Sequence, residues 1–203
     1  MGDYEEEETG SIGGKDWRGV PYKLNFESEE EKLYFENARH LVQTTRESLY
    51  DAIKVCRPGN CLSDVGAAIQ DRADANNYCT VEKYRGHGTY NILCAGQSLL
   101  FLFMRAVQHD LTGVVNRRFL GISHNFHCAP YVSHFRNNDR MELRPGMIFT
   151  IEPMLTMGSA RCFEWKDDWT VATVDNSLAA QFEHTILITE GDPEILTLPG
   201  DSL

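Results

Sequence analysis

The sequence has 203 residues, 42% hydrophobic and 24% charged, which is enough to bury the core of a single domain. Its net charge of −11 argues against a nucleic-acid partner. The six cysteines form no C-x-x-C pair and no apolar signal segment opens the chain, so we expect reduced thiols and a cytoplasmic protein. The most apolar stretch, 92–104, is shorter than the roughly 20 residues that cross a bilayer, so we predict no membrane span.

The N-terminal segment differs in composition from the rest of the chain. Residues 1–31 hold ten acidic side chains against three basic ones, and residues 1–27 also contain five glycines. Such a composition buries too little apolar surface to offset the entropy lost on ordering. We therefore predict a flexible acidic tail without strands over 1–27, followed by one domain over 28–203.

Two helices are expected after the tail. Ser28 and Glu31 have the spacing of a capping box in front of apolar residues at helical intervals, and this helix should end at the Arg57-Pro58-Gly59 turn. Ser63 can cap a second helix that runs to about Ala75. The period then changes, and β-rich runs bounded by proline and glycine predict strands over 147–152, 169–174 and 182–189. This order predicts an α+β domain with a curved antiparallel sheet.

Three polar side chains stand out. His87 lies between two glycines, which allow a tight backbone bend and leave room for an ion. Glu152 and Glu183 lie at the ends of apolar strands, where a charge is costly unless it faces solvent or meets a cation. A histidine with two carboxylates is a ligand set suited to divalent metals, but each residue alone is also typical of a solvated surface.

Four other residues invite a metal interpretation that we do not adopt. His109 and Asp110 are adjacent in an apolar, unpatterned segment, and His124 lies beside the segment 126–135. His134 precedes the polar run 136–139, where we expect a solvated loop.

Six segments, in chain order, resemble those of the methionine aminopeptidases, metallopeptidases with the pita-bread fold. They are RGHG (85–88), FHCAPYVSHF (126–135), LRPGMIFTIEPM (143–154), DDWTVAT (167–173), SLAAQFEHTILIT (177–189) and EILT (194–197). The resemblance covers residues 29–88 and 122–198, and its HCAP and DDWT forms are most similar to the eukaryotic cytosolic branch.

The resemblance implies a partial pita-bread fold with helices on the outer face of the sheet, and removal of N-terminal methionine from nascent proteins by dinuclear-metal hydrolysis. It implies metal ligands at His87, Glu152 and Glu183, catalytic roles for His127 and Glu152, and substrate contacts from His127, Phe126 and Trp169. The family's ions are cobalt, manganese, zinc or iron, and we expect one or none here. The implied partners are nascent polypeptide N-termini and the ribosome, and we expect a monomer.

Two features depart from the family pattern. Its two aspartate ligands lie in segments with no match here, and before the first helix only Asp3 and Asp16 could replace them. Residues 89–121 interrupt the family's histidine motif, and we expect a poorly packed insert or a translated unspliced segment. A chain without two ligands can also be a non-catalytic protein-binding module or a truncated product.

Overall fold

The computed structural model describes residues 11–15, 21–88, 128–167 and 170–198. The chain divides into two compact units, Met1–His40 and Leu41–Leu203, and each is described by itself.

The first unit contains a hairpin where we predicted a tail without strands. Strand β1, Ser11–Lys15, pairs antiparallel with β2, Pro21–Asn25. The prediction without strands was wrong for these two segments because it weighed overall composition and ignored local pattern. Tyr22 and Leu24 alternate with polar residues, which is the period of a strand.

Helix α1 spans Glu29–Lys54 and begins and ends as predicted. Ser28 Oγ accepts a hydrogen bond from the backbone N–H of Glu31 at 3.1 Å. The Glu31 carboxylate in turn accepts from Glu27 N at 2.7 Å, so the capping box closes one residue earlier than the sequence pattern indicated. Neither helix of the described ranges is long and apolar enough to cross a membrane.

Helix α2 spans Leu62–Ala75, and its N-cap is Cys61 instead of the predicted Ser63. The Asp64 carboxylate accepts from Cys61 N at 2.8 Å, while Ser63 lies in the first turn and donates its N–H to Asp139 O at 3.1 Å. The acid at the third helical position thus fixes the start of α2. The helix ends as predicted, because Asn77 adopts a left-handed φ of 56°.

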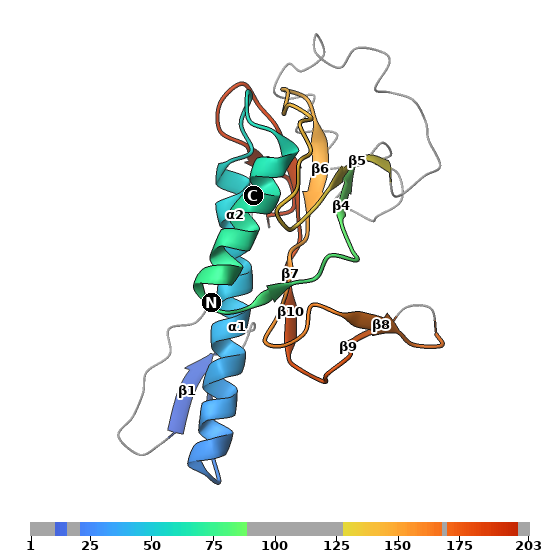
Figure 1. Ribbon diagram of the computed structural model, residues 1–203. Helices are drawn as coiled ribbons and strands as arrows, with labels where there is room; N and C mark the ends of the chain where they lie inside the picture. The colour runs from blue at the N-terminus through green and yellow to red at the C-terminus, as the bar shows by residue number, and fades with distance from the viewer. Residues whose placement is uncertain (1–10, 16–20, 89–127, 168–169, 199–203) are drawn as a thin grey trace. The chain divides into compact units, whose positions relative to one another are not determined.

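The second unit contains antiparallel sheets (Figure 1). Its described strands are β3 (Cys79–Thr80), β4 (Gly86–Gly88), β5 (Cys128–Val132), β6 (Ile148–Ile151), β7 (Met154–Thr156), β8 (Cys162–Glu164), β9 (Val171–Thr173), β10 (Ala179–Gln181), β11 (His184–Leu187) and β12 (Glu194–Ile195). A five-stranded sheet has the order β12-β11-β6-β4-β5, and a three-stranded one the order β10-β7-β3, while β8 pairs with β9. Strands β6, β9 and β11 fall inside the three predicted runs, which confirms the α+β class.

One hydrophobic core joins the second unit's helices to its sheet. Leu49 of α1 and Ile69 of α2 are buried in the same cluster as Phe149 of β6 and Ile186 of β11. In Figure 1, α2 and the second half of α1 lie side by side along one side of the strands. The helices therefore cover one face, and β4, β6 and β11 run as neighbours within the five-stranded sheet.

Candidate metal centre

Two carboxylates face each other where an antiparallel ladder is interrupted. Glu152 and Pro153 separate β6 from β7, and Phe182 and Glu183 separate β10 from β11. Pro153 has no N–H to donate, so the ladder opens at this point. The pairs β6–β11 and β7–β10 nevertheless keep one register across the gap, which places Glu152 directly opposite Glu183.

His87 reaches the same place from the neighbouring strand β4. Its backbone N–H donates to Thr150 Oγ1 at 3.0 Å, and the residue is buried. We expected the flanking glycines to provide a tight bend and room for an ion. In the structure these glycines are required for a different reason. A Cβ on Gly86 would collide with Thr150 O, and one on Gly88 with Ala129 O. Both glycines allow the close approach of neighbouring strands.

The structure brings together the three predicted metal ligands. One ligand atom each from His87, Glu152 and Glu183 lies within 4.8 Å of the other two, and His87 Nε2 is 3.9 Å from Glu152 Oε1. His87 is buried, Glu152 is half-buried and Glu183 is exposed, so the cluster opens to solvent on the Glu183 side.

The Glu152 carboxylate lies in an environment that disfavours its charge. Burial, and then the negative charge of Glu183, raise its pKa to about 7, although a 3.2 Å hydrogen bond from Thr150 Oγ1 opposes the shift. Among the described residues, its other polar side-chain contacts are Gln181 Nε2 at 3.4 Å and His87. No lysine or arginine of the described ranges is among these partners, so the repulsion between the two acids is not offset there.

This donor set fits a divalent cation. Two protein ligands that each lie about 2.0–2.2 Å from one ion are separated by up to roughly 4 Å, and the 3.9 Å between His87 and Glu152 falls within that limit. An imidazole with two carboxylates suits zinc, manganese, iron or cobalt. Such an ion would also relieve the repulsion between Glu152 and Glu183.

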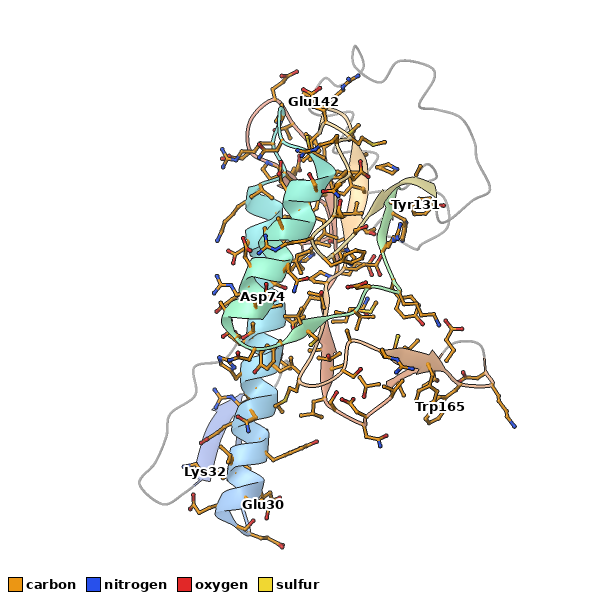
Figure 2. All side chains as sticks on the ribbon, viewed as in Figure 1. Glu30, Lys32, Asp74, Tyr131, Glu142 and Trp165 are labelled. Carbon is orange, nitrogen blue, oxygen red and sulfur yellow. The ribbon has the colours of Figure 1, made fainter. Side chains whose placement is uncertain are left out.

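His134 is a residue of this site that the sequence analysis misplaced. It is 1% exposed, so the prediction of a solvated loop position was wrong. Its Nε2 accepts hydrogen bonds from Gly86 N at 3.3 Å and from Glu152 N at 3.1 Å, and burial lowers its pKa to about 3. Alternation could have revealed it: Tyr131, labelled in Figure 2, is half exposed, whereas Val132 and then His134 turn inward.

Several predicted residues lie outside the described part of the chain. They are Phe126, His127, Trp169, Asp3, Asp16, His109, Asp110, His124 and the segment 89–121. Their roles stay predictions.

A buried imidazole and two opposed carboxylates, held at a break in an antiparallel sheet, form a candidate metal site in an α+β protein. The sequence profile of metallopeptidase family M24 matches residues 26–190, and the chain belongs to this family.

Named relatives narrow this assignment. The chain is 40% identical over 162 residues to methionine aminopeptidase 1D, chloroplastic/mitochondrial, of Arabidopsis thaliana, which covers 80% of this chain and 37% of that protein. It is 40% identical over 162 residues to the methionine aminopeptidase of Salmonella typhimurium, covering 79% and 49%. For methionine aminopeptidase 1 of Saccharomyces cerevisiae the identity is 35% over 161 residues, covering 79% and 33%.

Solved structures agree with these relatives. The methionine aminopeptidase of Rickettsia prowazekii matches with a TM-score of 0.61 and 32% identity, covering 93% of this chain and 60% of that one. The Thermotoga maritima methionine aminopeptidase matches with a TM-score of 0.60 and 31% identity, covering 93% and 59%. The resemblance to methionine aminopeptidases and the partial pita-bread fold are thereby confirmed. The chain spans between about a third and a half of the length of these three relatives.

Proposed function

We propose that this chain is a methionine aminopeptidase polypeptide whose His87, Glu152 and Glu183 hold a divalent metal ion. The observation that carries the proposal is the convergence of His87, from strand β4, with Glu152 and Glu183, which are opposed at a ladder break. The named relatives supply the reaction, which is removal of an N-terminal methionine.

The protein's own groups suit this chemistry. A bound ion would polarise the scissile carbonyl and lower the pKa of an attacking water. Glu152, with a pKa near 7, is poised to accept and return a proton at neutral pH. In the proposed site, His127 binds the substrate's peptide group, and Phe126 and Trp169 contact the methionine side chain.

The number of ions follows from the ligand charge. The three ligands carry two negative charges, and two adjacent divalent ions would need more compensation than that. We therefore propose one well-held ion, drawn from cobalt, manganese, zinc or iron.

The proposed substrates are nascent polypeptide N-termini in the cytoplasm, reached as they leave the ribosome. The support is the enzyme named in the relatives, together with the exposed Glu183 that leaves the cluster open to a peptide from solvent.

The test combines metal content with turnover. The full chain is stripped of metal and reloaded with manganese, cobalt, zinc or iron(II), and methionine release from a Met-Ala-Ser peptide is then measured. Glu183→Gln should abolish release, whereas Glu190→Gln, a matched exposed acid beyond the same strand, should leave it unchanged. Metal binding without release under any ion would reject the enzyme and identify a non-catalytic module. Absence of metal binding would reject the site itself.

A further inference from the structure

Side chains, as well as backbone, connect strand β4, which carries His87, to the end of β6, which Glu152 directly follows. The backbone pairing between β4 and β6 is at Gly88 and Phe149. Closer to the ligand cluster, the two strands are bridged by a side chain from a third segment. The backbone N–H groups of Gly86 and Glu152 both donate to His134 Nε2. Buried N–H groups need such partners, because an unpaired one costs about as much as a lost hydrogen bond.

The direction of these bonds defines the state of the imidazole. Nε2 accepts from Gly86 N at 3.3 Å and from Glu152 N at 3.1 Å, so it carries a lone pair and the ring proton resides on Nδ1. His134 is 1% exposed, so bulk water does not reach the ring. The ring is therefore a neutral acceptor shared by two strands.

The two donors are placed where they matter for metal binding. Gly86 directly precedes His87, and Glu152 is itself a candidate ligand. Gly86 packs closely against both His134 and Thr150, since a Cβ at Gly86 would lie 3.2 Å from His134 Nε2 and would collide with Thr150 O. Movement of His134 would thus shift both ligand-bearing strand ends at once.

We propose that His134 is a positioning residue for the metal site, setting the distance between His87 and Glu152 through its unprotonated Nε2. The inference rests on the proposed function, because it assigns His134 a role in the metal affinity of that site. It does not make His134 a ligand. Partners that orient metal ligands from outside the coordination shell typically change affinity by 10–100-fold when they are removed.

The first measurement uses the metal-free wild-type chain, so that it depends on neither metal nor turnover. Nitrogen-15 NMR should show His134 protonated at Nδ1, with hydrogen-bond couplings from the Gly86 and Glu152 amides to Nε2. A proton on Nε2, or the absence of both couplings, would overturn the proposal.

The second measurement is the affinity for Mn²⁺ by calorimetry. His134→Phe keeps the ring's bulk but removes the acceptor, and should weaken binding by about 10–100-fold. His134→Gln places an amide oxygen near the Nε2 position and should restore most of the affinity. Ile69→Ala, buried in α2, is the control for lost stability and should bind Mn²⁺ like the wild type.

The outcomes separate this inference from the proposed function. A wild-type chain that binds no Mn²⁺ would overturn the metal site. A wild-type chain that binds it, with His134→Phe equally tight, would overturn only the role of His134. If His134→Phe does not fold, the NMR couplings and the Gln variant decide the question.

Discussion

Two acidic residues of the second unit are held in opposite ways. Asp175, in the turn between β9 and β10, accepts hydrogen bonds from Ser159 N at 2.7 Å and from Ser177 N at 3.2 Å, and these bonds and the Ser177 hydroxyl lower its pKa to about 2. Glu152, at the break between β6 and β7, is half-buried opposite Glu183, and its pKa rises to about 7. The protein's own donors stabilise the charge of Asp175, whereas burial and the neighbouring Glu183 disfavour the charge of Glu152.

The largest expected contrast is in Mn²⁺ affinity, when one acid is removed from the metal site and one from the turn that contains Asp175. Glu183→Gln deletes a candidate ligand and should weaken Mn²⁺ binding by more than about 100-fold, beyond the effect typical of residues outside the coordination shell. Asp175→Asn should leave Mn²⁺ affinity unchanged, because its donors are backbone and serine groups. Calorimetric titration of both variants measures the contrast, and equal losses would show that the two acids do not differ as argued.

The stability of the metal-free chain should respond to Glu152 in a defined pH window. Its folded pKa of about 7 exceeds the ordinary 4.5, so this carboxyl holds more proton in the folded state between these values, and the contribution of Glu152 to stability falls as pH rises through the window. At about 1.4 kcal/mol per pKa unit, the penalty above pH 7 is on the order of 3 kcal/mol at most.

Glu152→Gln should therefore stabilise the metal-free chain at pH 8 and change it little at pH 4, as measured by urea unfolding. His134 has the opposite sign: its folded pKa of about 3 lies below the ordinary 6.5, so its contribution is present above pH 6.5 and is lost as pH falls toward 3. Because His134 contributes equally in both chains, a stability difference between Glu152→Gln and the wild type that stays constant from pH 4.5 to 7 would contradict the assignment of that penalty to Glu152.

The affinity for Mn²⁺ should also depend on pH, because the ion and a proton compete for the Glu152 carboxylate. Below pH 7 an incoming ion must displace the proton from Glu152, so Mn²⁺ affinity should rise by up to about tenfold per pH unit and level off above pH 7. Calorimetry in buffers of different ionisation enthalpy counts the released proton. Proton release that is absent at pH 6 would mean that Glu152 is not a ligand.

Sequence patterns predicted the local elements better than their pairing. The capping residues of α1 and the strand runs can be recognised from composition and spacing, whereas the three candidate ligands are assigned through the family resemblance. The opposition of Glu152 and Glu183 depends on a register shared by β6–β11 and β7–β10, which spacing along one strand does not contain. The burial of His134 depends on β4 and β6 packing against it, which is a tertiary effect that overrides its polar sequence context.

The smallest expected effect comes from Thr150, which links the two ligand strands by its hydroxyl. Oγ1 accepts from His87 N and donates to Glu152 Oε1, which lowers the pKa of that carboxyl. Thr150→Val keeps the shape but removes both bonds, so the pKa of Glu152 should rise further and Mn²⁺ affinity at pH 7 should fall severalfold. Thr150→Ser retains the hydroxyl and is the matched control. Since the loss in Thr150→Val acts through protonation of Glu152, it should shrink at pH 9, whereas a loss that is constant with pH would indicate a displaced His87 instead.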